Sequence, residues 1–361
     1  MIPFVDFTRE YKEIGKEIDV AIKEVLERGF FILGPELENF EKKFAEYCDA
    51  KYCVGVNSGT DALYLSLLCA GIGPGDEVIV PVNTAVPTAM AVSMSGAKPV
   101  FADCDENFLI DIDKIPQLLT KKTKAIMPVH LYGRACDMGR LKKLAVANKL
   151  FLIEDCAQSA GAEWDGKKVG TLGDFGCFSF YPTKNLGAYG DGGAVIINNE
   201  DYYKKLLASR FYGQADRVHC SGFGINSRLD EIQAAILNAK LKHLDIWNNA
   251  RQKIADLYRK LITNPKIILP AASNDNNHIY HLFVIRAPKR DSLKKILEDK
   301  GIKTAIHYPA PLSRHSFFAG AKQELFPMAD QYAGEILSLP MHPFLEESEI
   351  REIADVLNNY A

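Results

Sequence analysis

The sequence predicts an α/β protein with a mostly parallel sheet flanked by helices, followed by a smaller α/β unit. From about Tyr52 onward, short β-branched runs alternate with longer segments of helical periodicity, as strands and crossover helices do. At 361 residues, 47% of them hydrophobic, the chain can bury a large core. Because parallel strands end at one edge of a sheet, we expect the active site at their carboxyl ends.

Composition argues against several classes of partner. The formal net charge is -3, so the chain has no basic field for nucleic acid or an anionic membrane. The eight cysteines are scattered, without a Cys-x-x-Cys pair or a cysteine–histidine cluster, so we expect reduced core thiols and no metal site. We find no leader-like or membrane-spanning segment, and the expected compartment is therefore the cytoplasm.

The amino-terminal part predicts two amphipathic helices. The first ends at Gly29, a natural helix stop, and the second begins after the turn at Gly34 and Pro35. Their apolar residues recur at helical spacing. These residues are Ile14, Ile18, Ile22, Val25 and Leu26 in the first helix and Leu37, Phe40, Phe44 and Tyr47 in the second.

The alternating region predicts one element after another up to an aromatic strand at 177–181, which Pro182 ends. The expected strands before it are 51–56, 76–81, 98–104, 125–133 and 150–157. The expected helices between them are 57–71, 87–96, 112–119 and 138–149.

The carboxyl-terminal part predicts a second, smaller α/β domain. Residues 229–261 have helical composition but are too many for one compact helix, so we expect them to link two domains, 1–245 and 246–361. The second domain should contain a strand at 281–287, a helix at 291–301, a strand at 302–308 and two closing helices.

Lys184 stands between the aromatic strand and a turn that holds four glycines between positions 187 and 193. At a strand exit its side chain can point into a cleft, where apolar surroundings make the neutral, nucleophilic amine accessible. The glycines allow something flat and polar to approach closely. A lone lysine in a loop is more often a surface residue, so the argument depends on the groups upstream.

The first upstream group is Asn57–Ala62, where a strand passes through a glycine turn into a helix start. Free N–H groups and the positive end of the helix dipole favour an anion there, and Thr60 adds a hydroxyl. Ser, Thr and Asp are also ordinary helix caps, so these residues alone leave a capping role open.

The second group ends the strand at 150–157. Asp155 closes a strongly apolar run, and a carboxylate there needs a cationic or hydrogen-bonding partner, such as a protonated ring nitrogen. Ala157 is small enough to lie against a flat ring, and Gln158 could reach a ring substituent. Helix capping by the aspartate is the ordinary alternative. Downstream, Ser179 could bind a phosphate.

An anion cradle, a strand-end carboxylate and a cleft lysine are together what a pyridoxal phosphate site requires. The phosphate needs fixed donors, the pyridine nitrogen needs an acid partner, and the aldehyde needs an amine. The chain resembles the sugar aminotransferases of the DegT/DnrJ/EryC1/StrS group, which have the aspartate aminotransferase fold. The motifs that carry this resemblance are FILGPELENFE, VNSGTDALYL, GPGDEVIVP, GAKPVFAD, MPVHLYGR, IEDCAQSAGA, GCFSFYPTKNLGAYGDGG, NSRLDEIQAAIL and IHYP.

The resemblance implies a role for each residue of the cofactor site. Lys184 corresponds to the Schiff-base lysine, Asp155 to the partner of the pyridinium nitrogen, and Gln158 to the contact of the ring hydroxyl. The phosphate ligands would be Gly59, Thr60 and Ser179. Asn226 would reach the cofactor phosphate of a neighbouring subunit, which implies a homodimer with shared active sites.

The resemblance also suggests substrate contacts at Tyr181, His307 and Tyr308. His130, at a strand end, is more often a satisfied structural group than a catalyst. One position departs from the family: an aromatic residue usually follows the threonine of PVNT and stacks on the cofactor, whereas this chain has Ala85 there.

The implied reaction is ping-pong transamination from L-glutamate to a nucleotide-linked keto-sugar. The cradle NSGTDAL resembles that of members acting at the C3 ketone, and Asp61 could bias the accepted hydroxyl pattern, so we expect a thymidine-diphosphate-linked 3-keto-6-deoxyhexose. A 4-keto sugar, a uridine-diphosphate-linked sugar and a non-catalytic pyridoxal phosphate-binding regulator are the alternatives. Lys184 argues against the deoxygenating relatives, which have histidine at that position.

Overall fold

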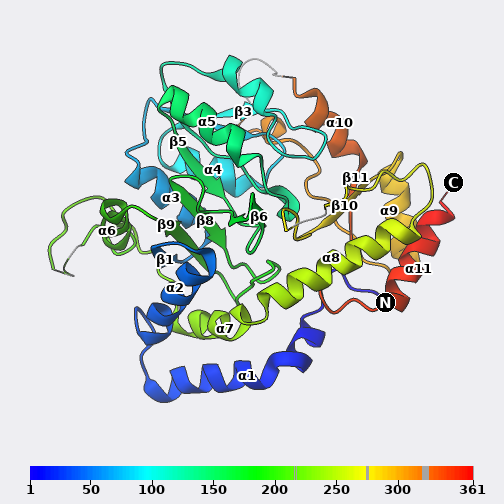
Figure 1. Cartoon of the computed structure of the whole chain (residues 1–361), viewed down its shortest axis with the longest axis horizontal. Coiled ribbons are helices and arrows are strands. Elements are labelled where there is room, and N and C mark those ends of the chain that lie inside the picture. The colour runs from blue at the N-terminus through cyan, green and yellow to red at the C-terminus, as the bar shows by residue number, and fades with distance from the viewer. Residues whose placement is uncertain (215, 217, 274–275, 319–324, 361) are drawn as a thin grey trace.

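A computed structural model describes residues 1–214, 216, 218–273, 276–318 and 325–360, and its centre is a seven-stranded sheet (Figure 1). The strand order is β1-β9-β8-β5-β4-β2-β3. The five strands from β8 to β3 are parallel, and β9 is antiparallel to both neighbours, which confirms a mostly parallel sheet. The strands are β1 (Tyr52–Val56), β2 (Glu77–Pro81), β3 (Lys98–Ala102), β4 (Thr123–Ile126), β5 (Phe151–Asp155), β8 (Phe175–Ser179) and β9 (Gly193–Ile197).

Helices cover both faces of this sheet (Figure 1). The large-domain helices are α1 (Phe7–Arg28), α2 (Pro35–Cys48), α3 (Gly59–Cys69), α4 (Val86–Met94), α5 (Met138–Asn148), α6 (Glu200–Ser209) and α7 (Glu231–Leu241). Side chains alternate between the two faces along β8. Cys177 joins the core under α3, whereas Phe178 packs edge-on against Phe44 of α2 with ring centroids 5.0 Å apart. Burial on both faces explains why these strands are almost continuously apolar.

The two amino-terminal helices form as predicted. Asp6 caps α1 by accepting the Arg9 N–H at 3.0 Å, and Gly29 ends the helix with a φ of 68°, a conformation that glycine adopts without a Cβ clash. Pro35 begins α2, where its missing N–H costs no hydrogen bond.

A second buried cluster lies in the carboxyl-terminal part, where Ile2 also packs; both chain ends lie on this side (Figure 1). Its elements are α8 (Leu244–Leu261), β10 (Phe283–Arg286), α9 (Arg290–Asp299), β11 (Ile336–Leu339) and α11 (Glu347–Asn358), whereas the buried side chains of α10 (Pro327–Glu335) pack with the core of the large sheet. The break at 242–243 between α7 and α8 agrees with the expectation that 229–261 is not one compact helix. The domain boundary at 245 stays a prediction.

Several local predictions differ from the structure. Residues 302–308 form only isolated bridges, at Ile302 and Ala305, and the strand that pairs with β10 is β11. The strand expected at 125–133 ends at Ile126, the last residue of β4, whereas the helix expected at 112–119 forms as a 3-10 helix, η1 (Ile112–Leu118), which contains Pro116. Seven cysteines are buried as expected, but Cys220 is exposed.

The remaining short elements are a hairpin and two 3-10 turns, namely β6 (Glu163–Trp164), β7 (Lys167–Lys168), η2 (Leu131–Gly133) and η3 (Leu312–Arg314). Within the described ranges, no helix combines the length and apolar character needed to cross a bilayer.

Candidate active site

A cavity of about 290 Å³ lies at the carboxyl ends of β5 and β8, at the edge where the sequence predicts the site. It brings together residues from the three predicted groups and from the start of α4. Its walls are formed by Ser58, Gly59, Thr60, Leu63, Thr84, Ala85, Pro87, Thr88, Val129, Asp155, Ala157, Gln158, Ser179, Tyr181, Lys184, Asp191 and Gly192. The sequence predictions for Lys184, Asp155, Gln158, Gly59, Thr60, Ser179 and Tyr181 thus converge on one cavity.

Lys184 is placed by a tight turn after β8. Its backbone N–H donates to the Tyr181 carbonyl at 2.8 Å, and the turn closes so tightly that a Cβ at Gly187 would lie 2.2 Å from the Pro182 carbonyl oxygen. Burial lowers the pKa of the Lys184 amine to about 8, although the Asp155 carboxylate acts in the opposite direction. A neutral amine is therefore accessible near neutral pH.

The cradle at the start of α3 combines capping with an anion site. The Ser58 hydroxyl accepts the Asp61 N–H at 3.1 Å and so caps the helix. Gly59 and Thr60 supply the first helical N–H groups at the cavity wall, where an anion would meet them. A Cβ at Gly59 would lie 2.6 Å from the Ser179 Cβ, so glycine lets these two predicted phosphate ligands lie side by side.

Asp155 is almost fully buried, with 3% of its surface exposed. Its Oδ1 accepts the Ala157 N–H at 3.1 Å, and its Oδ2 accepts the Thr88 hydroxyl at 2.8 Å. Burial raises the pKa of Asp155, while these two hydrogen bonds and the Lys184 charge lower it. The carboxylate is thus held in one orientation at the cavity wall.

Gln158 connects the cavity to the carboxyl-terminal part. Its Oε1 accepts the Tyr132 N–H at 2.6 Å, and its Nε2 donates to the Tyr308 hydroxyl at 3.2 Å. The Tyr132 hydroxyl in turn donates to the His307 carbonyl. One Nε2 hydrogen of Gln158 remains for a ring substituent, since an amide nitrogen carries two.

Three predicted residues, His307, Tyr308 and Asn226, do not line the cavity. The His307 ring hydrogen-bonds Ser338 with 2.9 Å between Nδ1 and Oγ, and burial lowers the pKa of His307 to about 4. Neither His307 nor Tyr308 contributes to the cavity wall, and burial raises the pKa of Tyr308 to about 12. Tyr181 is 52% exposed at the wall, and Asn226 is exposed outside the cavity.

Sequence reasoning missed Thr84, Thr88 and Asp191 in the cavity wall. The signal for the first two was their spacing of four residues in PVNTAVPT, which repeats a hydroxyl at a strand exit and in the first turn of α4. Asp61 is the opposite case, because its Oδ2 accepts the Ser227 hydroxyl at 2.6 Å and its side chain does not line the cavity.

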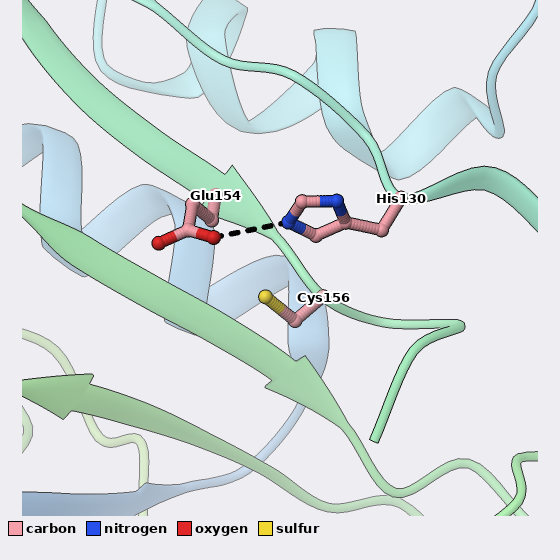
Figure 2. A group of neighbouring side chains, drawn as sticks. All are labelled: His130, Glu154 and Cys156. Atoms are coloured by element: carbon pink, nitrogen blue, oxygen red, sulfur yellow. Dashed lines mark hydrogen bonds and ion pairs between the residues drawn. The ribbon is translucent and has the colours of Figure 1, made fainter. Parts of the chain in front are cut away.

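His130, Glu154 and Cys156 form a buried group, in which Glu154 and Cys156 are the chain neighbours of Asp155 (Figure 2). His130 Nδ1 accepts the Cys136 N–H at 3.0 Å, so Nε2 carries the proton and donates to Glu154 at 3.0 Å. Glu154 also accepts three backbone N–H groups, those of Gly170, Leu172 and Gly173. Since its acceptor sites are filled, the group holds the turn at 170–173 to β5, in agreement with the structural role expected for His130.

Comparison with known proteins indicates the same class of protein as the geometry of the cavity does. The model of the DegT/DnrJ/EryC1/StrS aminotransferase family matches residues 12–358. A dTDP-3-amino-3,6-dideoxy-alpha-D-galactopyranose transaminase from Aneurinibacillus thermoaerophilus is 46% identical over 361 residues, which is 100% of this chain and 99% of the relative. A UDP-N-acetyl-3-dehydro-alpha-D-glucosamine 3-aminotransferase from Acidithiobacillus ferrooxidans is 43% identical over 99% of this chain and 97% of its own.

Solved structures share the fold over nearly the full length. The crystal structure of Streptomyces venezuelae DesV in complex with a ketimine intermediate superposes with a TM-score of 0.96 and 42% identity, covering 99% of this chain and 97% of the other. Structures of this fold have been solved with bound pyridoxamine phosphate and in the pyridoxal phosphate form.

Proposed function

The chain belongs to the DegT/DnrJ/EryC1/StrS aminotransferase family, and on that premise we propose that it aminates a thymidine-diphosphate-linked 3-keto-6-deoxyhexose with L-glutamate as donor. It is a sugar aminotransferase with pyridoxal 5'-phosphate as cofactor. The observation that carries the proposal is the single cavity that gathers the lysine amine, the buried carboxylate and the anion cradle. The 46% identical transaminase named for a dTDP-3-amino sugar supports the choice of substrate.

The residues present fit this cofactor. The absence of a Cβ at Gly59 lets Ser179 lie beside the start of α3, so the Ser179 hydroxyl and the N–H donors of that helix start are together available to a phosphate. Asp155 would hold the ring nitrogen, Ala157 would lie against the ring, and Lys184 would attach to the aldehyde. When bound, the cofactor supplies an electron sink for the carbanion that forms at the amino acid α-carbon.

The chain's own residues would perform the proton transfers. Lys184 Nζ, displaced by the incoming amino acid, would take the proton from the amino acid α-carbon. It would then deliver this proton to the cofactor carbon that is bonded to the transferred nitrogen. Its pKa of about 8 suits this task, because both the neutral and the charged amine are accessible near pH 7. Asp155 would keep the proton on the ring nitrogen, since a buried carboxylate stabilises a cation beside it.

The choice of the C3 ketone is supported by a small side chain in the cavity wall. Ala85 lines the cavity, so a methyl group stands where family members usually have an aromatic ring, and a sugar has space to present a different carbon. Asp61 does not support the choice, because its carboxylate accepts the Ser227 hydroxyl. A 4-keto sugar and a uridine-diphosphate-linked sugar are the competing substrates, and the 43% identical UDP-sugar relative favours the second of these.

The second half-reaction tests the substrate directly. The enzyme is first loaded with glutamate to convert the cofactor to its amino form, then each keto-sugar is offered separately and the return of the lysine-bound cofactor absorption is followed. We expect the thymidine-diphosphate-linked 3-keto sugar to give the fastest return and an amino-sugar product by mass. A faster 4-keto or uridine-diphosphate-linked sugar would reassign the substrate and leave the aminotransferase activity standing.

The proposal includes a homodimer with shared sites, located in the cytoplasm. Asn226 is exposed and does not line the cavity of its own chain, so it is free to reach a partner's site. Large apolar side chains are exposed on and after α1, and such surface commonly becomes an interface. They are Phe7, Tyr11, Val20, Leu26, Phe30 and Phe31. All eight cysteines are free thiols, which supports a reducing compartment.

A further inference from the structure

Two buried threonines form a chain of hydroxyl groups that ends on Asp155. Thr88 Oγ1 lies 2.8 Å from Asp155 Oδ2, and Thr84 Oγ1 lies 3.1 Å from Thr88 Oγ1. Both threonines are 1% exposed, and both line the cavity. Thr84 follows β2, Thr88 lies in the first turn of α4, and Asp155 ends β5, so the chain joins three elements at the site.

The number of available hydrogens determines which group donates in each of these two hydrogen bonds. A hydroxyl carries one hydrogen, and an ionised carboxylate can only accept. Thr88 must therefore donate to Asp155, which leaves its oxygen as the acceptor for Thr84. Donation from Thr84 polarises the Thr88 hydroxyl, and hydrogen bonds arranged in this sense strengthen one another in a low dielectric.

The hydrogen bond from Thr88 restricts rotation of the Asp155 carboxylate about its Cβ–Cγ bond. The Ala157 N–H holds Oδ1 and the Thr88 hydroxyl holds Oδ2, so neither oxygen can rotate without losing a bond. An ionised carboxylate has about four acceptor positions, so a ring nitrogen in the cavity can still be bound. The first turn of α4 thereby sets where that nitrogen must lie.

We propose that Thr88, supported by Thr84, is a positioning residue for Asp155, which orients the carboxylate toward the cofactor ring and keeps it hydrogen-bonded before the cofactor arrives. This inference rests on the proposed role of Asp155 as the partner of the ring nitrogen. Thr88 itself touches no reacting atom. Its effect passes entirely through the carboxylate.

Isosteric and conservative substitutions separate this role from packing. Thr88→Val keeps the shape but removes the hydroxyl, whereas Thr88→Ser keeps the hydroxyl and removes a methyl group. The dissociation constant of pyridoxal phosphate is measured by reconstitution of the apo protein, alongside the rate of the glutamate half-reaction. Because a hydrogen bond to a charged group is worth more than a neutral one, we expect Thr88→Val to weaken cofactor binding about tenfold and to slow the half-reaction. Thr88→Ser should restore both to within about threefold.

Two further variants complete the test. Thr84→Val should change both quantities in the same direction by a smaller factor, since Thr88 still donates to Asp155. Thr263→Val, whose hydroxyl lies 3.4 Å from Asn358 Oδ1 far from the cavity, is the matched control and should change neither. The melting temperature of each apo variant shows whether it is folded. Equal losses in the serine and valine variants would show that packing, and not the hydroxyl, matters.

A double-mutant cycle distinguishes failure of this inference from failure of the proposed site. In an Asp155→Asn background the carboxylate is already gone, so Thr88→Val should cause almost no further loss of cofactor affinity. The same loss in both backgrounds would show that Thr88 acts independently of Asp155 and would overturn the inference alone. A wild-type half-reaction in Asp155→Asn itself would instead overturn the role assigned to Asp155.

Discussion

The Ser227 hydroxyl lies 2.6 Å from Asp61 Oδ2 and accepts the Asn57 N–H at 3.0 Å, so one side chain joins the phosphate cradle to the segment that carries Asn226. Ser227 is fully buried, whereas its neighbour Asn226 is exposed. In the proposed dimer, each chain would contribute its cradle to its own phosphate site and its Asn226 to the partner's site. Ser227 holds both of these contributions in place within one chain. A change in the cradle of one subunit would therefore shift Asn226, the residue proposed to bind the phosphate in the other subunit.

Ser227→Ala should weaken pyridoxal phosphate binding by about three- to tenfold, because the half-buried Asp61 carboxylate and the Asn57 N–H both lose their partner. The measurement is cofactor titration of the apo protein. Ser221→Ala, in the loop between α6 and α7, is the control. If the affinity of Ser227→Ala equals that of the wild type, the cradle does not depend on this anchor.

Borohydride reduction of the cofactor-loaded protein should attach the label to Lys184, as mapped by peptide mass. Lys184→Ala should still bind the cofactor through the cradle and Asp155, yet lose turnover by several orders of magnitude, since the amine assigned to the proton transfer is gone. Label on a different lysine, or turnover near the wild-type rate, would remove Lys184 from the mechanism.

Lys184 should also reduce the stability of the apo protein in a pH-dependent way. Its folded pKa of about 8 is below the unfolded value of 10.5, so stability rises with pH between these values, and the cost is fully present below pH 8. Apo Lys184→Met should therefore be more stable than the apo wild type at pH 7, by about 3 kcal/mol, which is the lowering of the pKa from 10.5 to about 8 expressed as free energy. Urea unfolding at pH 7, 9 and 10.5 should show the difference shrinking; a constant difference would contradict the lowered pKa.

Hybrid dimers should recover activity from two inactive parents. A heterodimer of Lys184→Ala and Asn226→Ala contains one site with both residues intact, so a random equal mixture should reach about a quarter of the wild-type activity. Mass spectrometry verifies subunit exchange. No recovery after exchange would mean that each chain completes its own site.

The sequence predicted the parallel core well because its information is local. A strand buried on both faces, such as β5, is a continuous apolar run in the sequence. The apolar stripe of α1 and the glycine that ends it can likewise be read from the sequence without knowledge of the helix's neighbours. The strand β11 was missed because Ile336–Leu339 follows α10 directly without a turn signal. Its strand conformation depends on pairing with β10, a contact between distant segments.

Within the candidate site, too, some residues could be predicted from local sequence and others could not. The place of Asp155 in the cavity could be predicted because a carboxylate at the end of an apolar strand is unusual, and that of Lys184 because it follows an aromatic strand and precedes a glycine-rich turn. Thr88 could not, since threonine in the first turn of a helix is ordinary and only the fold brings it to Asp155. The orientation of Asp61 was equally hidden, because its partner lies 166 residues away in the chain.

The distribution of thiols makes the molecule convenient to label. Cys220 is exposed in the segment between α6 and α7, the same segment that carries Asn226, while the other seven cysteines are buried. A maleimide dye or a nitroxide should therefore attach at one place per chain, with no cysteine removed beforehand. Two such labels in a dimer would act as a ruler between the paired segments. The ruler would report whether they move as donor and acceptor alternate.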